Sequence, residues 1–570
     1  MNERKYSCKL FPNLSLKFFS GFRYFKKLIT NKFFWLPLFL IIVSLAILVS
    51  IPSTRYKLIG EFWHQKYVVR VISLNNNQPI IGAKVTIGPT TSYTNNKGIA
   101  SLEVSIGYKT ISITKQYFAS IKKTILIPFS VSSTAIYKIK ATGILVPLKV
   151  INAITKTPIA NVTILSDGSK VETNKFGHAI IVLPANIKTV NALLNSSGFN
   201  SKSVIIHIFS QTLSTNTFSL TPIGTVYFLS NNTGNINVDS VNLDGTDRQT
   251  LLKGTGNESL YSTQLLPSDN SQYLALLANR NGSESHLYVI NTSNDSINEV
   301  NPKATGYQIF GWTPDGHLIY EIYNNDMPIW MSGTEDLMTY NASSGISSIL
   351  AASKGIGTSS SNFANQNFQN IILLSNNKIL YSSVWSGTNN LMVTNLPSQS
   401  TILLQTMNTV DSNSLNSSAF LSVPADNYSG FKVRLVGLIK VVVSLYNEAN
   451  QNTSYYIYNN AQLSSTNKQN YNSYLNSSQT PYGQFGYLVS PNNNKVLVAK
   501  YINGHNVIFI ESINGGSKRQ IAILNTTYNI YGWVTNNYVL VSKNNNELYV
   551  MPASGANNQN DLIKVTNYLE

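Results

Sequence analysis

The chain has 570 residues, a formal net charge of +17 at pH 7 and a single cysteine, Cys8. The length allows several domains, and the lone cysteine excludes both a disulfide framework and a cysteine-rich metal site. The charge is uneven, because residues 225–570 hold 16 Lys/Arg against 20 Asp/Glu and the basic excess therefore lies in the first 224 residues. A slightly acidic C-terminal region argues against nucleic-acid binding, and no nucleic-acid partner is expected.

The N-terminal region contains an uncharged apolar stretch at residues 33–51. At a rise of about 1.5 Å per residue it would form roughly 28 Å of helix, close to the roughly 30 Å hydrocarbon core of a bilayer. Eight Lys/Arg residues precede it and only Arg55 and Lys57 follow closely, so the positive-inside rule places the N-terminus in the cytoplasm. The side chains expected to contact membrane lipid include Phe33, Trp35, Leu40, Ile41, Leu45 and Ile51.

This pattern predicts a single-pass protein of the plasma membrane, with most of the chain outside the cytoplasm. The boundaries are a basic cytoplasmic tail at 1–32, a transmembrane helix at 33–51 and a juxtamembrane linker at 52–64. A cleaved signal peptide is the alternative, but the apolar run is longer than a usual signal core and no clear cleavage site follows. The basic region beyond the helix fits either attraction to an anionic envelope or a merely solvated surface.

Two related β-rich modules follow the linker. Short runs of Val, Ile, Thr and Tyr alternate with polar residues and turn signals, which is typical of β-sandwiches. A motif that starts at Pro79 and ends at Gly98 recurs, offset by 79 residues, from Pro158 to Gly177. The repeat predicts two seven-strand β-sandwich modules, at 65–142 and 143–222.

The repeated motif resembles the carboxypeptidase regulatory-like family of immunoglobulin-like sandwiches, with the PEGA domains as a near alternative. It reads P-x-x-G/N-A/V-x-V/I, then T-N-x-x-G, then an aromatic residue. The second copy departs at Asn161, where the first has Gly82, although Asn tolerates the same left-handed backbone. The resemblance implies that these modules are spacers without an active site.

The region from 225 to 570 predicts a β-propeller. Its strands come in groups of 40 to 50 residues, the usual length of a four-stranded blade. The turn Thr313-Pro314-Asp315-Gly316 and its partial copy at Ser490 resemble the TolB-like and WD40-like propellers. Opening strands are expected near Thr225, Tyr261, Tyr307, Phe368, Phe420, Phe485 and Tyr528. Seven blades are favoured, and six are the alternative if the strand at Thr225 only completes the last blade.

Several aromatic residues are candidates for a binding surface. Trp330 and Trp385 break the blade repeat, whereas Trp312 and Trp533 recur at equivalent places and suggest packing between blades. The segment 452–484 is polar and rich in tyrosine, and it fits either a contact loop or a disordered insertion. Its candidate binding residues are Tyr455, Tyr456 and Tyr458.

No catalytic motif is present. The six histidines are scattered without ligand spacing, and no G-x-S-x-G elbow occurs. No catalytic residue, metal site or cofactor is therefore expected. The overall prediction is an all-β, membrane-anchored binding or scaffolding protein that recognises a protein or an envelope polymer. The alternatives are a propeller-type carbohydrate-active enzyme, such as a glycosidase or lyase, and a scaffold for envelope assembly.

Overall fold

The structure is a computed structural model that describes residues 63–570 with internal gaps, together with a few positions between 37 and 56. The gaps are 131–132, 209–213, 329–330, 354, 357–363, 366, 375, 386–387, 397, 409–429, 436–439, 448–451, 460, 478–488, 513–516, 545, 557–560 and 568–570. Leu40 and Ile41 are helical and exposed, whereas Phe33, Trp35, Leu45 and Ile51 lie outside the described residues. No helix among the described residues has both the length and the apolar character needed to span a membrane.

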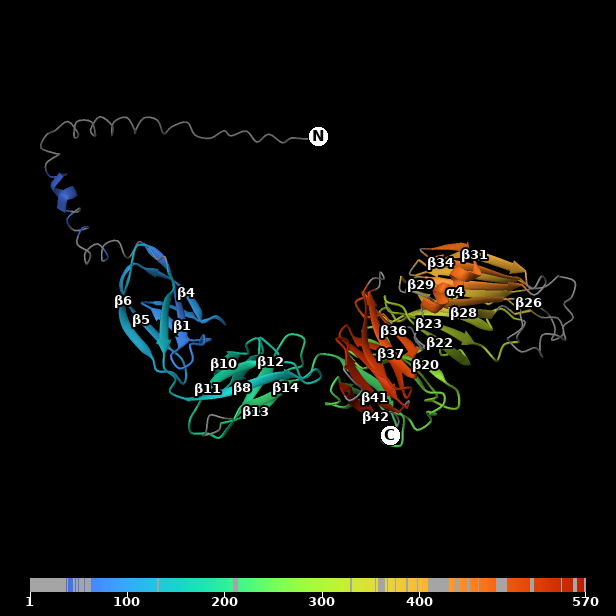
Figure 1. Cartoon of the computed structure of the whole chain (residues 1–570), viewed down its shortest axis with the longest axis horizontal. Helices are drawn as coiled ribbons and strands as arrows, with labels where there is room; N and C mark the ends of the chain where they lie inside the picture. Colours follow the sequence, from blue (N-terminus) through green and yellow to red (C-terminus); the bar gives the residue numbers. More distant parts are fainter. Residues whose placement is uncertain are drawn as a thin grey trace, which may run out of the picture. The chain divides into compact units, whose positions relative to one another are not determined.

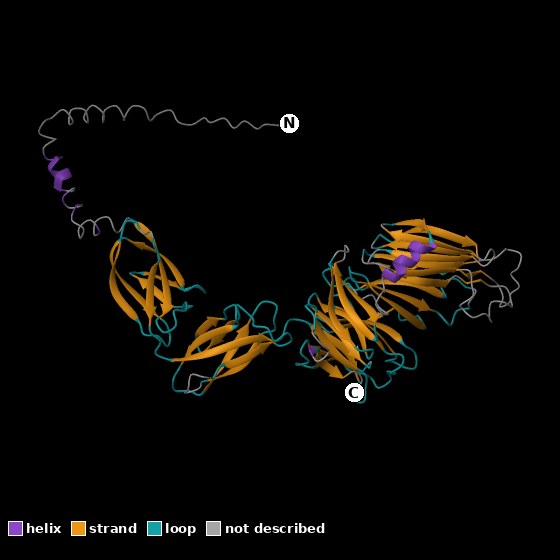
Figure 2. Cartoon of the chain, viewed as in Figure 1, coloured by secondary structure: helices purple, strands orange, loops and turns teal. Residues whose placement is uncertain are grey.

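The described chain is almost entirely β-structure and divides into two compact units (Figures 1 and 2). The first unit contains two modules of seven strands each. In the first module, β4-β1-β7 form one sheet and β3-β2-β5-β6 the other; in the second, β11-β8-β14 and β10-β9-β12-β13 repeat this order. The strands are β1 (His64–Ser73), β2 (Lys84–Ile87), β3 (Thr90–Tyr93), β4 (Ile99–Ser105), β5 (Gly107–Thr114), β6 (Ile121–Ile127), β7 (Ala135–Ile139), β8 (Ile144–Asn152), β9 (Thr163–Ser166), β10 (Ser169–Glu172), β11 (His178–Leu183), β12 (Thr189–Asn195), β13 (Lys202–His207) and β14 (Asn216–Leu220).

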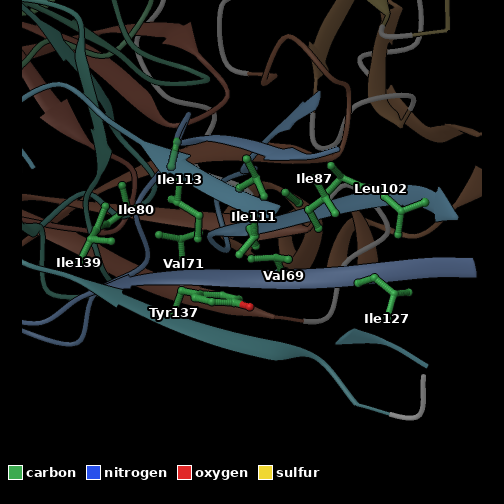
Figure 3. Packing of buried hydrophobic residues seen from close by; sticks show 14 of the residues in the cluster. Val69, Val71, Ile80, Ile87, Leu102, Ile111, Ile113, Ile127, Tyr137 and Ile139 are labelled. Atoms are coloured by element: carbon green, nitrogen blue, oxygen red, sulfur yellow. The ribbon is translucent and has the colours of Figure 1, made fainter. Parts of the chain in front are cut away.

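The core of the first module lies between its two sheets (Figure 3). Val69 and Val71 on β1 point toward Ile111 and Ile113 on β5, and all four are fully buried. Burial alternates along these strands because successive side chains point to opposite faces, which explains the period of two in the sequence.

The repeated T-N-x-x-G motif forms the same hairpin in both modules. The Asn95 side chain accepts hydrogen bonds from the backbone N–H of Lys97 and Ile99, and Asn174 makes the same contacts in the second copy. Gly98 has φ +72°, and a Cβ there would lie 2.5 Å from the Val71 carbonyl oxygen. Glycine is therefore required by the backbone conformation and by the close approach of β1.

The turn that contains Asn161 explains the departure between the two motifs. Gly82 has φ +67° and Asn161 has φ +58°, so both residues take the same left-handed conformation. Asn is one of the few side chains that occupies this region at modest cost. The expectation that Asn replaces Gly without changing the turn is confirmed.

The described residues of the second unit form seven sheets of three or four strands in sequence order, numbered here sheet 1 to sheet 7, and a two-stranded pair, β26 and β27. Sheet 1 has β15 (Thr225–Ser230), β16 (Asn237–Asn242) and β17 (Gln249–Leu252); sheet 2 has β18 (Gln264–Pro267), β19 (Tyr273–Ala278), β20 (His286–Asn291) and β21 (Ser296–Val300); sheet 3 has β22 (Gly306–Trp312), β23 (His317–Tyr323), β24 (Glu335–Asn341) and β25 (Ile346–Ala351). The pair is β26 (Gly355–Ile356) and β27 (Ala364–Asn365); sheet 4 has β28 (Asn367–Leu374), β29 (Lys378–Trp385), β30 (Thr388–Asn395) and β31 (Ser400–Asn408). Sheet 5 has β32 (Gly430–Leu435), β33 (Val441–Asn447), β34 (Asn452–Asn459) and β35 (Gln462–Thr466); sheet 6 has β36 (Lys495–Ile502), β37 (His505–Ser512) and β38 (Lys518–Leu524); sheet 7 has β39 (Tyr528–Thr535), β40 (Tyr538–Lys543), β41 (Glu547–Pro552) and β42 (Ile563–Asn567).

Consecutive sheets pack face to face through shared apolar clusters, which is the architecture of a β-propeller. Such clusters join sheets 1 and 2, 2 and 3, 3 and 4, 4 and 5, and 6 and 7. A further cluster joins the first and last sheets, since Val226 and Phe228 of sheet 1 pack with Leu548 and Val550 of sheet 7. β15 pairs with β16, so it does not complete the last blade, and the sheet count agrees with seven blades rather than six.

The tyrosine-rich segment 452–484 is regular in its described part. It forms β34, β35 and the helix α4 (Lys468–Ser477), so the expectation of a long loop is wrong for these residues. Figure 1 shows α4 against the sheet that holds β34, and the Tyr455 and Tyr471 rings lie 4.8 Å apart between them. The wrong expectation has a physical reason. Side chains alternate between the two faces of a strand, and in this segment the outer face carries the polar residues that are also frequent in loops.

Candidate functional site

The most exposed aromatic side chain in the described part of the propeller is Tyr261, in the connection between β17 and β18. It is 97% exposed, and the neighbouring Leu260 is 50% exposed. The sequence predicts an opening strand near Tyr261, but the strand begins at Gln264 and Tyr261 lies in a turn. We call Leu260 and Tyr261 the apolar tip. Large apolar side chains in this position gain little from folding, and we take this pair as the candidate recognition surface.

A buried ion pair holds the loop beneath the apolar tip. Arg280 Nη1 lies 3.0 Å from Glu258 Oε1, and both side chains are largely buried. The Glu258 carboxylate also accepts hydrogen bonds from the backbone N–H of Thr255 and Gly256. Burial tends to raise the pKa of Glu258, but these backbone donors and Arg280 hold it below its usual value. The carboxylate is therefore charged, and it fixes the backbone of the loop that leads to the tip.

Further hydrogen bonds tie the same loop to sheet 2. Arg280 Nη2 donates to the Lys253 carbonyl at 3.0 Å, and Thr255 Oγ1 donates to the Arg280 carbonyl at 3.0 Å. The backbone N–H of Ser259 donates to Asn279 Oδ1 at 3.1 Å. These contacts fix the backbone that leads to the apolar tip. A loop that is already ordered loses less conformational entropy when it binds a partner.

The predicted binding residues do not form one surface. Tyr458 has no exposed surface and belongs to the core between sheets 4 and 5, so it is unavailable to a partner. Tyr456 is half-buried against the same core, whereas Tyr455 points to the other face, toward α4. Trp385 is the last residue of β29, and Trp330 lies outside the described residues. The sequence alone does not reveal whether a tyrosine is buried or exposed. For this reason Leu260 and Tyr261 were not predicted as binding residues.

The recurrent tryptophans pack between blades, as the sequence predicts. Trp312 is buried in the cluster that joins sheets 2 and 3, and Trp533 in the cluster that joins sheets 6 and 7. The Trp312 indole Nε1 donates to the carbonyl of Leu266 on the neighbouring sheet at 2.9 Å. These residues are therefore structural, whereas Tyr261 of the apolar tip is 97% exposed and Tyr501 on β36 is 64% exposed.

The described carboxylates mostly serve the fold. Asp315 pairs with His317 at 3.0 Å, and Asp336 accepts a hydrogen bond from the Ser353 backbone N–H at 2.7 Å. Glu321 is buried between sheets 3 and 4, and Tyr323 donates its hydroxyl hydrogen to it at 2.8 Å. Burial raises the pKa of Glu321 to about 7, and nearby Glu335 adds to this rise. Within the described ranges, no three His, Cys, Asp or Glu side chains gather in a metal-binding arrangement.

A cavity of about 390 Å³ lies on the second module of the first unit. It is open to solvent and is lined by Leu165, Asp167, Ser169, Asn191 and Leu193, among others. These residues belong to one outer sheet face and the adjoining turn. The cavity contains one carboxylate and no histidine, so it lacks the paired groups that acid–base chemistry requires.

No family model matches the chain, and no curated protein matches it either. Among solved structures it is similar to TolB from Acinetobacter baumannii, at 11% identity over 58% of this chain and 77% of that one, with a TM-score of 0.24. It is similar to the β-propeller domain of the Trilobed protease from Pyrococcus furiosus, at 12% identity, 51% and 81% coverage and a TM-score of 0.29. A putative 6-phosphogluconolactonase from Bacteroides uniformis shows 12% identity, 60% and 96% coverage and a TM-score of 0.30. Likeness at this level adds nothing about function, and the assignment of a propeller rests on the seven packed sheets.

Proposed function

We propose that this chain is a non-catalytic, membrane-anchored binding protein whose propeller recognises another protein outside the cytoplasm. The observation that carries the proposal is the apolar tip, a Leu-Tyr pair held in solvent by the buried Glu258–Arg280 ion pair. Tyrosine anchors of this kind dominate the energetics of many protein interfaces. The uncharged stretch 33–51 would hold the chain in the plasma membrane through lipid contacts, with the two β-sandwich modules as spacers.

A protein partner is favoured over an envelope polymer. A polymer-binding face usually combines several aromatic platforms with many polar groups, whereas the tip offers one aromatic and one aliphatic side chain. The two together suit a small apolar pocket on a protein surface. Scaffolding of an envelope assembly fits the same contact, because it too requires a specific protein partner.

The test places a photo-crosslinking amino acid at position 261 of the full-length chain in its native cells. We expect discrete crosslinked species that are absent when the same group replaces Tyr501, a tyrosine on β36 that is also exposed. The substitution Tyr261→Ala should abolish capture of the same partner by the purified chain, while Tyr501→Ala should not. Identical crosslinks from both positions, or none from position 261, would refute the proposal.

The alternative function is a carbohydrate-active enzyme. Glu321 and Glu335 lie on adjacent strands, and Glu321 has the raised pKa expected of a general acid. However, Glu321 is only 4% exposed and lies between two packed sheets, so substrate would not reach it. The burial favours a structural role for Glu321 and, with it, the binding function.

A further inference from the structure

In the part of the chain that the structure describes, sheet 1 contains the second, third and fourth strands of a blade and lacks the first. In the four-stranded sheets 2 and 3, the third strand ends in an asparagine, Asn291 or Asn341, whose side chain accepts the N–H of the residue two positions later. In sheet 1 the strand that ends in asparagine is β16, at Asn242, although the Asn242 side chain bonds Thr246 Oγ1 and Asn200 instead of the backbone N–H. By this repeat β16 is a third strand, and β15 is a second strand.

The β-bulges support the same alignment. In sheets 3, 4 and 7 the fourth strand has a bulge against the third, opposite Leu337, Leu391 and Leu548. β17 has this bulge against β16, opposite Val238. The first strands of sheets 3, 4 and 7 are bulged against the second, whereas those of sheets 2 and 5 pair without interruption, as β15 does, so the alignment rests on the bulge between β16 and β17. Bulges recur at equivalent places in repeated units, so sheet 1 is a blade without its innermost strand.

The residues before β15 do not supply the missing strand. Thr221 to Gly224 are described and connect β14 directly to β15 without forming a strand beside it. The last four strands of the chain all belong to sheet 7. In the described part of the chain, β15 therefore has one strand neighbour, β16.

In the described part of the chain, one edge of β15 leaves a defined set of backbone groups without a strand partner. The N–H of Asn242 donates to the Thr246 carbonyl, so the backbone N–H and C=O groups of Asn242 point away from its strand partner Thr225. Alternation then directs the N–H and C=O groups of Thr225, Tyr227 and Leu229 away from β16. The side chains of Val226, Phe228 and Leu229 are buried by sheets 7 and 2. A strand covered on both faces but unpaired along one edge is a template for another strand.

We propose that an extended segment of a partner protein adds to β15, antiparallel to it, as the missing first strand of sheet 1. Backbone hydrogen bonds would provide affinity, and side-chain packing against sheets 2 and 7 would provide specificity. This chain's own first strands define the chemistry of the occupant. Four of them, β18, β22, β28 and β39, contain no charged residue and are rich in Leu, Ile, Tyr, Phe or Trp, whereas the first strand of sheet 5, β32, contains Lys432 and Arg434. The proposal rests on the proposed binding function and names a second contact of the same propeller.

The test measures amide hydrogen exchange of the full-length chain with and without a synthetic peptide of the β39 sequence, YNIYGWVT. In the free chain we expect the amides of Thr225, Tyr227 and Leu229 to exchange much faster than those of Val226 and Phe228. The peptide should slow the first group by roughly tenfold or more, because each amide gains a strand partner. A control peptide N-methylated on the residues that face β15 should have no effect, whereas methylation of the alternate residues should leave protection intact.

Each other outcome overturns the proposal. Slow exchange at Thr225, Tyr227 and Leu229 in the free chain would show that the chain itself fills the edge. Protection that appears only at high chain concentration would identify a second copy as the occupant. Equal protection by both methylated peptides would exclude strand addition. The Tyr261→Ala variant should show unchanged peptide protection, so failure of this site and failure of the apolar tip are distinguishable.

Discussion

Glu321 illustrates how the interior of the propeller changes the chemistry of one residue. Its carboxyl lies between sheets 3 and 4, and the Tyr323 hydroxyl is its hydrogen-bond donor. Removal from water penalises the charged form, so the pKa rises from the ordinary 4.5 to about 7. Between pH 4.5 and pH 7, Glu321 stays protonated in the folded chain but is ionised in the unfolded chain. The stabilisation is fully present below pH 4.5 and is lost as the pH rises through 7.

The Glu321→Gln variant tests this linkage. Between about pH 5 and pH 7 the free energy of unfolding of the wild type should fall, by on the order of 2 kcal/mol from this group. The glutamine side chain does not titrate, so the variant should lose that part of the pH dependence. Urea unfolding at several pH values measures this pH dependence. The control is Glu103→Gln, at an exposed position on β4. A pH dependence equal to that of the wild type would contradict the assignment.

At the scale of elements, the blades are held to one another by side chains and by few hydrogen bonds. Most backbone groups of a sheet are paired within that sheet, so the contact between sheets is apolar. Trp312 is an exception, because its indole both fills the space between sheets 2 and 3 and donates to Leu266. A bulge at Gly311 turns this tryptophan toward the neighbouring blade.

Substitution of Trp312 separates packing from the hydrogen bond. Trp312→Phe should lower the free energy of unfolding by about 1–3 kcal/mol, because it leaves the Leu266 carbonyl without its donor. Trp312→Ala should cost about 3–5 kcal/mol through the cavity it creates. Trp63→Phe, at an exposed position in the first unit, is the control and should have no measurable effect on urea unfolding. Equal losses for the Phe and Ala variants would show that packing contributes nothing.

At the scale of the whole molecule, the uncharged stretch 33–51 is expected to determine location. It precedes the strand-rich units, and the basic excess of the chain lies on either side of it. A spanning helix or a basic surface would each hold the chain at a membrane. Salt screens only the electrostatic attraction of the basic surface. The two explanations therefore predict different behaviour in a salt wash.

Deletion of residues 1–51 tests the anchor. The full-length chain should stay with the membrane fraction after a wash at high salt, because burial of the apolar stretch does not depend on ionic strength. The chain that begins at Pro52 should be released. Fractionation followed by immunoblotting measures both. Salt-sensitive retention of the truncated chain would assign the attachment to the lysines of the first unit, and salt-resistant retention would contradict the anchor.

The sequence by itself determined the all-β character, the two related modules and the succession of blades. These features follow from local signals, namely alternation of burial along strands and turns that need Gly or Asn, as at Gly98 and Asn161. The buried role of Trp312 was also predictable, because its repetition at Trp533 marks a position that recurs between blades.

Only the tertiary structure decided which tyrosines are exposed and which strand lacks a neighbour. Tyr458 is in the core and Tyr261 is in solvent, although both lie in polar, tyrosine-containing segments. Their exposure depends on which sheet faces pack together, and that packing joins residues far apart in sequence. The free edge of β15 is likewise a property of pairing, because a strand carries no local mark of the partner it does not have.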